Sequence, residues 1–102
     1  MKKIDITKDN FEDVAKIYEG ISAKLKLEFS DYYKYSFSFV GEVEDIRIYV
    51  SYGGNADDTY RFNVSALEKI SAPKTLQGLF DEYFYISIKD KKNEVEYTSY
   101  HY

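Results

Sequence analysis

Residues 34–64 read KYSFSFV, GEVED, IRIYVSY, GGNADDT and YRFNV. Apolar and polar residues alternate in the first, third and fifth of these runs, which is the period of a strand with one buried face. We therefore predict strands at 34–40, 46–52 and 60–64, joined by an acidic turn and by a glycine-rich turn. This pattern predicts a three-stranded antiparallel meander with helices packed on its apolar side.

The residues before this meander predict a long helix. We expect Thr7 or Asp9 to start it, and Asp9 stands three residues before a glutamate, which is the spacing of a capping box. We expect Gly20, inside the helix, to let it approach the sheet closely. Residues 25–29 alternate like a strand, but extending a nucleated helix is cheap, so we predict helix to about Leu27 and a connection at 30–33. The apolar stripe of this helix follows spacings of three and four: Phe11, Val14, Ile17, Ile21 and Leu25.

Two short helices are predicted after the meander. Ser65 and Glu68 have capping-box spacing directly after a predicted strand, which indicates a short helix to about Ile70. Pro73 suits the first turn of another helix. The inner stripe of that second helix is Leu76, Leu79, Phe80 and Tyr83.

The end of the chain returns to a period of two. Residues 85–89 and 94–100 flank a polar turn and predict a C-terminal β-hairpin, while residues 2–6 fit a short edge strand. The expected fold is therefore a single α+β domain over residues 1–102, with an N-terminal helix, a three-stranded antiparallel meander, one or two short helices and a C-terminal β-hairpin. The pattern leaves open where the first helix ends and whether the hairpin joins the main sheet.

Composition argues against several classes of protein. The 102 residues include no cysteine and a single histidine, His101 next to the C-terminus, so the usual thiol or histidine nucleophile systems have no basis here. There is no phosphate-binding loop or dinucleotide fingerprint. We expect neither enzymatic activity nor a cofactor. The charged N-terminus lacks the apolar run of a signal peptide, and no run is long enough to span a membrane, so a cytoplasmic location is expected.

Negative charge is concentrated in the turns of the predicted meander. Residues 36–60 contain one basic and five acidic side chains, whereas residues 1–35 hold seven of each and residues 61–102 hold six of each. The net charge of −4 therefore arises from this segment, which favours a partner with a basic surface over direct nucleic-acid binding. Solvation of loop tips is the alternative. The candidate partner-binding acids are Glu42, Glu44, Asp45, Asp57 and Asp58.

Tyrosine is the other unusual feature, since the chain has 12 Tyr, 7 Phe and no Trp. On the predicted outer face, Tyr49 lies near Arg47, and these residue types are common at the centres of protein interfaces. We therefore add Tyr49 and Arg47 to the candidate partner-binding residues. A polar sheet face that meets only water, and tyrosine used as a strand former, are the alternatives. The predicted outer face consists of Ser36, Ser38, Arg47, Tyr49, Ser51, Arg61 and Asn63.

Oxygen ligands for a metal occur in the glycine-rich turn. Asn55, Asp57 and Asp58 are close in sequence, but they lack the spacing and the distal glutamate of an EF-hand. Residues of these types also form tight turns, and we expect no metal.

In its order of a helix, a meander and short helices over about residues 8–84, and in its acidity, the chain resembles small phage-encoded anti-CRISPR proteins that block Cas9. The resemblance implies an inhibitor that occupies the basic channel of a CRISPR nuclease with Glu42, Glu44, Asp45, Asp57 and Asp58. The order also resembles double-stranded-RNA-binding domains, but a basic helix start is absent.

We expect a non-enzymatic inhibitor of a host nucleic-acid-handling protein, as a monomer or small homo-oligomer. An immunity protein or antitoxin against a basic toxin and a virion assembly protein remain alternatives.

Overall fold

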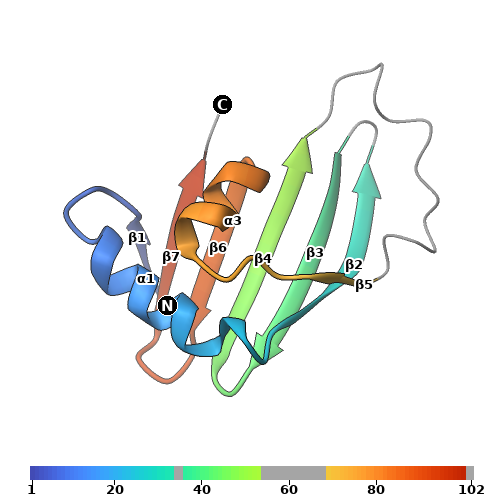
Figure 1. Cartoon of the computed structure of the whole chain (residues 1–102). Helices are drawn as coiled ribbons and strands as arrows, with labels where there is room; N and C mark the ends of the chain where they lie inside the picture. Colours follow the sequence, from blue (N-terminus) through green and yellow to red (C-terminus); the bar gives the residue numbers. More distant parts are fainter. Residues whose placement is uncertain (34–35, 54–68, 101–102) are drawn as a thin grey trace.

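A computed structural model describes residues 1–33, 36–53 and 69–100 of the chain. Within these ranges, one mixed β-sheet carries two helices on one of its faces (Figure 1). In chain order the elements are β1 (Lys2–Asp5), α1 (Phe11–Ser22), β2 (Lys26–Tyr33), β3 (Ser36–Val43), β4 (Ile46–Gly53), β5 (Lys69–Ser71), α3 (Leu76–Glu82), β6 (Tyr85–Asp90) and β7 (Val95–Tyr100).

The sheet has seven strands in the order β1-β7-β6-β4-β3-β2-β5. β1 lies parallel to β7, and the other neighbouring strands are antiparallel. The pairing of β4 with β6 joins residues 46–51 to residues 85–90. The sheet is thus assembled from segments that are far apart in the sequence. The predicted architecture of a three-stranded antiparallel meander with a C-terminal hairpin is wrong, because the described strands form one seven-stranded mixed sheet.

β4 is a central strand that is paired on both edges. Val50 lies opposite Phe39 of β3 on one edge and opposite Ile86 of β6 on the other. The predicted meander has a strand at 60–64 beside β4. In the structure β6 takes that position. Residues 60–64 themselves lie outside the described residues. The antiparallel meander of the described sheet is β2-β3-β4, one strand earlier than predicted.

The predicted helix up to Leu27, with a connection after it, is also wrong. α1 ends at Ser22 and β2 starts four residues later. Leu25 and Leu27 are buried while Lys26 between them is exposed, which is the two-residue period of a strand. Leu27 lies opposite Ile70 of β5, and β2 also pairs with β3. Pairing on both edges, together with burial of the leucines, explains why this segment leaves the helix.

Two other predicted helix boundaries fail. Asp9 does not cap the first helix, because Asn10 precedes Phe11 at its start and makes no side-chain cap hydrogen bond. The short helix predicted to reach Ile70 is replaced at its end by β5, which pairs with β2. Residues 65–68, where that helix was predicted to start, lie outside the described residues.

α3 is fixed at its start by two side chains. Thr75 Oγ1 accepts a hydrogen bond from the backbone N–H of Gly78 at 3.0 Å, as expected of a helix N-cap. Glu19 of α1 accepts a second bond from the backbone N–H of Leu76 at 3.3 Å. Pro73 therefore precedes the helix and does not occupy its first turn. The Glu19 contact also ties α3 to α1.

The two C-terminal runs pair with each other as predicted, and both are interior strands of the main sheet, which settles the point that the sequence pattern left open. β6 and β7 pair antiparallel, with Tyr85 opposite Tyr100. β6 also pairs with β4, and β7 also pairs with β1. β1 is an edge strand, as the sequence pattern indicates.

The core lies between the helices and one face of the sheet. Phe11 of α1 and Phe80 of α3 meet edge to face, with ring centroids 5.5 Å apart. Such pairs add to the burial of apolar surface that stabilises the domain. The largest side chains that are fully buried are Tyr18, Leu27, Ile48, Leu76, Leu79, Ile86, Ile88, Val14 and Val50.

Two tyrosine hydroxyls are enclosed in this core. Tyr18 Oη donates a hydrogen bond to the carbonyl oxygen of Pro73 at 2.6 Å. Tyr83 Oη has no hydrogen-bond partner among the described residues. Burial raises the pKa of both hydroxyls, and the negative charge of Glu82 raises both further. The folded protein therefore holds both protons at a pH where the unfolded chain has begun to lose them.

Alkaline pH should destabilise the protein through these two side chains. These side chains leave the free energy of unfolding unchanged below the ordinary tyrosine pKa of about 10, and above it they lower this free energy by about 1.4 kcal/mol for each tyrosine per pH unit. Tyr83→Phe should remove one of the two contributions. Urea unfolding of wild type and variant at several alkaline pH values measures both slopes, and identical slopes would contradict this assignment.

Candidate binding face

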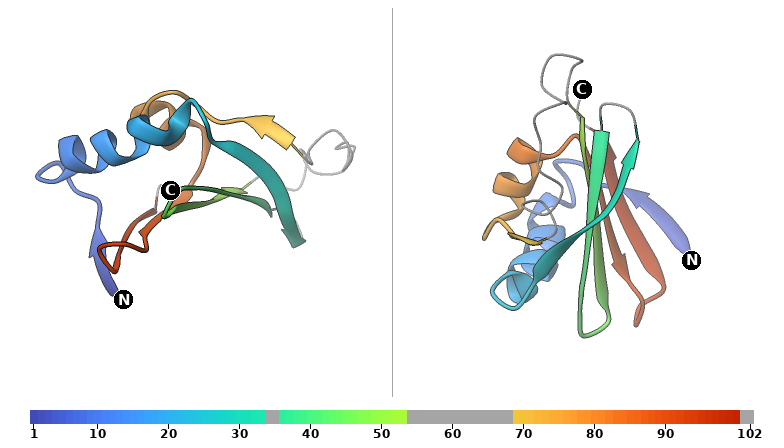
Figure 2. Two further views of the ribbon diagram at one scale, coloured as in Figure 1. Left: turned by 90° about the horizontal axis from the view of Figure 1, so that it is seen from below. Right: turned by 90° about the vertical axis from the view of Figure 1, so that its right-hand side faces the viewer.

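The side of the sheet opposite the helices is covered by neither described helix. In the left view of Figure 2 both described helices lie on one side of an arched sheet, and no other described element lies over the opposite side. The strand register places the side chains of this side in three rows that run across β3, β4, β6 and β7. We call these residues the open face: Glu42, Arg47, Lys89 and Glu96; Val40, Tyr49, Ser87 and Thr98; Ser38, Ser51, Tyr85 and Tyr100.

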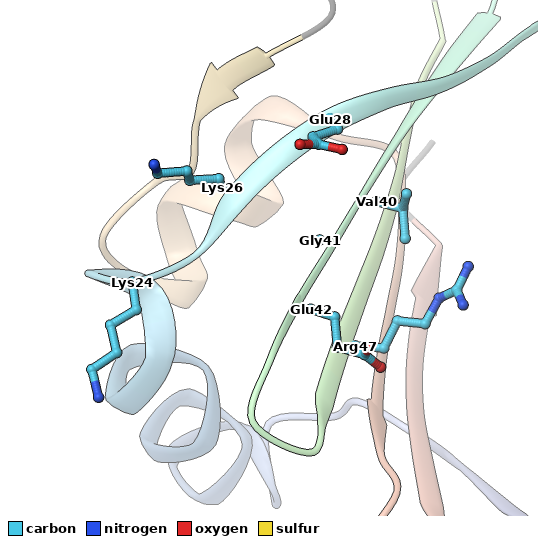
Figure 3. A pocket seen from close by; sticks show the side chains of 7 residues that line it. All are labelled: Lys24, Lys26, Glu28, Val40, Gly41, Glu42 and Arg47. Atoms are coloured by element: carbon cyan, nitrogen blue, oxygen red, sulfur yellow. The ribbon is translucent and has the colours of Figure 1, made fainter.

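Two adjoining hollows open on this face and share Arg47. The larger, of about 410 Å³, lies where β2 leaves β3, and we call it the β2–β3 hollow. Figure 3 shows that Lys24 and Lys26 extend away from its centre, while Arg47 extends from β4 away from Glu28. Its lining is Lys24, Lys26, Glu28, Val40, Gly41, Glu42 and Arg47.

The second hollow, which we call the tyrosine hollow, has a volume of about 300 Å³. Tyr49 and Tyr85 meet there with ring centroids 5.9 Å apart, and Tyr100 lies 4.5 Å from Tyr85. Burial raises the pKa of the Tyr85 hydroxyl, and the neighbouring Tyr100 and Glu96 raise it further. The lining is Arg47, Tyr49, Tyr85, Ser87, Lys89 and Glu96.

One row of the open face carries four charges in the order Glu42, Arg47, Lys89 and Glu96. Glu96 accepts a hydrogen bond from Ser87 Oγ at 2.8 Å, and Glu42 makes an ion pair elsewhere. Arg47 and Lys89 make no ion pair with any residue that the structure describes. Like charges directly opposite each other destabilise a sheet, and the carboxylates of Glu42 and Glu96, which lie opposite Arg47 and Lys89 on their other sides, offset part of this cost.

The acidic turn between β3 and β4 is less negative than its sequence suggests. Lys91 makes an ion pair with Glu42 and donates a hydrogen bond to it, and these contacts hold the pKa of the Glu42 carboxyl below its usual range. Lys24 lies 3.5 Å from Glu44. Exposed ion pairs of this kind are weak, so a partner could still compete for these carboxylates. Asp45 offers its carbonyl oxygen to the backbone N–H of Lys91.

The structure gathers only part of the predicted binding set. Arg47 and Tyr49 lie on the open face as neighbours in adjacent rows. Asp57 and Asp58 lie outside the described residues. Ser38 lies on the predicted side of the sheet, but it does not face water: its side chain is buried and lies 3.0 Å from Ser30, hydroxyl to hydroxyl.

Sequence reasoning missed the contribution of β6 and β7 to this face. Alternation in residues 85–89 puts Tyr85, Ser87 and Lys89 on one side of a strand. The missing step was the long-range pairing of β6 with β4, which no local pattern reports.

The described ranges contain no cluster of three or more His, Cys, Asp or Glu side chains that could hold a metal ion. Asn55, Asp57, Asp58 and His101 lie outside these ranges. Neither described helix has the length and apolar character needed to cross a membrane.

Comparison of the chain with protein-family models, with curated proteins and with solved structures found no match. The fold and the site therefore define the class of protein by geometry alone. The described residues form a small α+β domain whose seven-stranded sheet carries both described helices on one face, and its other face is tyrosine-rich and charged.

Proposed function

We propose that this chain is a non-enzymatic binding protein that captures a partner protein through its open face. The observation that carries the proposal is the grouping of Tyr49, Tyr85 and Arg47 on a sheet face that neither described helix covers. Tyrosine and arginine are over-represented among the residues that dominate binding energy, and such residues cluster near interface centres. The central position of β4 and β6 in the sheet suits that role.

Charge on the open face supports a partner of mixed charge. Arg47 and Lys89 stand at the centre of their row, and Glu42 and Glu96 stand at its ends. A complementary surface has carboxylates at its centre and basic side chains around them. Enzymes that act on nucleic acids need both, because carboxylates hold their metal ions and basic side chains bind phosphates.

The partner we propose is therefore a host protein that handles nucleic acid, such as a CRISPR nuclease. In this proposal a phage or another mobile element encodes the chain, which acts as an inhibitor in the cytoplasm of the bacterial host. The net charge of −4 favours such a basic partner. Because Glu42 and Glu44 share their charge with lysines, we assign most of the binding energy to the open face and less to the acidic turn.

Affinity capture from a bacterial lysate tests this proposal. The double variant R47A/Y49A should lose the captured protein, since truncation of central interface residues typically costs 2 kcal/mol or more, about 30-fold in affinity. The turn variant E44A/D45A, which changes two exposed carboxylates outside the open face, should retain most of the capture. Mass spectrometry of the captured protein identifies the partner.

The matched control is E12A/K16A, which removes two exposed charged side chains from α1 on the helical side of the domain. It should capture as wild type does. Retained capture by R47A/Y49A, with loss in E44A/D45A, would move the binding site to the acidic turn. Recovery of a secreted toxin in place of a nucleic-acid-handling protein would favour the immunity-protein alternative.

A further inference from the structure

We infer that the tyrosine hollow binds a phosphate monoester joined to a flat ring, the chemistry of a nucleoside monophosphate. The phosphate would lie against Arg47 and Lys89, and the ring against Tyr49 and Tyr85. This site is a property of the isolated chain and does not depend on the protein partner proposed above.

The charges of the hollow favour a phosphate dianion. Arg47 and Lys89 are direct cross-strand neighbours, and within the described residues neither has an ion-pair partner. A bound anion would relieve the repulsion between two like charges at this position. Arginine and lysine both bind phosphate, the first through its planar fork and the second as a point charge. A carboxylate would neutralise only one of the two cations.

The carboxylate in the hollow, that of Glu96, makes no ion pair with Arg47 or Lys89, so both cations are available to a ligand. Glu96 Oε2 accepts the hydroxyl of Ser87 at 2.8 Å, and its other oxygen lies 3.9 Å from the ammonium of Lys3. Glu96 is therefore engaged by Ser87 and Lys3 at the edge of the hollow toward β7 and β1. In this position it can also accept a hydrogen bond from a sugar hydroxyl of the ligand.

The tyrosine hollow is larger than a bare anion requires, and it has an aromatic lining that a bare anion does not require. At about 300 Å³ the hollow is at the lower end of the range of small-molecule sites. Tyr49 and Tyr85 lie one and two rows from the cations, with their rings at 66° to each other. A planar base can stack on one such ring and meet the edge of the other, and base–tyrosine stacking tolerates any base.

The test is an NMR titration of the isolated, isotope-labelled protein in low-salt buffer with AMP, with adenosine and with inorganic phosphate as separate probes. AMP should shift the signals of Arg47, Tyr49, Tyr85 and Lys89. Adenosine and phosphate should each bind about tenfold more weakly than AMP, because each lacks one half of the recognition. R47A/K89A should weaken AMP about tenfold or more, and its spectrum elsewhere shows whether it is folded.

The control K16A/K74A removes the same amount of charge from exposed positions outside the hollow and should bind AMP as wild type does. Absence of shifts with millimolar AMP would overturn the inference, as would equal weakening in both double variants. Phosphate binding equal to AMP binding would overturn the role of the tyrosines. None of these results bears on capture of a protein partner, which is measured separately.

Discussion

Gly41→Ala is expected to destabilise the protein by about 3 kcal/mol, the upper part of the range for an overpacked site. A Cβ atom at Gly41 would lie 2.5 Å from the backbone oxygen of Lys26 and 2.8 Å from a methyl carbon of Leu25. The first of these atoms belongs to the main chain of β2, so it cannot rotate away. Gly41 therefore allows β2 to cross closely over β3 at the edge of the β2–β3 hollow (Figure 3).

Gly20→Ala is the matched control for this substitution. A Cβ atom at Gly20 would meet nothing within 4 Å, so the expected close approach of the first helix to the sheet at this glycine is wrong. In the interior of α1, alanine should stabilise the protein by about 0.5–1 kcal/mol. Urea unfolding of both variants measures the difference. Equal stability of the two variants would contradict the close crossing at Gly41.

Leu27→Ala is expected to lower the free energy of unfolding by about 2–5 kcal/mol. Leu27 is fully buried in β2 and lies opposite Ile70 of β5, so truncation removes apolar contacts and leaves a cavity. The neighbouring Lys26→Ala changes an exposed side chain and should alter stability by no more than about 0.5 kcal/mol. Chemical denaturation compares the two. A similar small loss in both variants would place Leu27 outside the core.

Local patterns in the sequence predicted the buried face of each strand or helix better than they predicted which strands pair. Alternation in residues 46–52 placed Ile48 and Val50 inside the sheet and Arg47 outside, and the structure confirms these positions. The three- and four-residue spacing in the first helix likewise placed Val14 in the core. A period reports which side of an element is buried, because burial acts on each residue separately.

Strand order could not be obtained in this way. Residues 25–29 fitted both a helix and a strand, and the pairing of Leu27 with Ile70, which decides between them, lies far along the chain. The neighbour of β4 was assigned to the next predicted strand at 60–64, although β6 occupies that edge. Sequential strands are often neighbours in a sheet, and this sheet departs from that tendency at its centre.

The same limit explains why only part of the candidate site could be predicted from the sequence. Arg47 and Tyr49 could be placed on an outer face from alternation alone. Tyr85 and Lys89 reach that face only through the pairing of β4 with β6. The acidity of the turn was counted without the lysine that pairs with Glu42, which lies 49 residues away.

The structure also alters the basis of the inhibitor proposal. The resemblance to anti-CRISPR proteins was based on a helix followed by a three-stranded meander. The structure has a seven-stranded sheet in place of that meander. The proposal now depends on the chemistry of the open face and on the identity of the captured protein.

The most direct test of the account is calorimetric measurement of the affinity of the purified captured protein for wild type, for R47A/Y49A and for E44A/D45A. The account predicts about 30-fold weaker binding for R47A/Y49A and a much smaller loss for E44A/D45A. Wild-type affinity in R47A/Y49A, with the protein still folded, would contradict the claim that the open face is the binding surface.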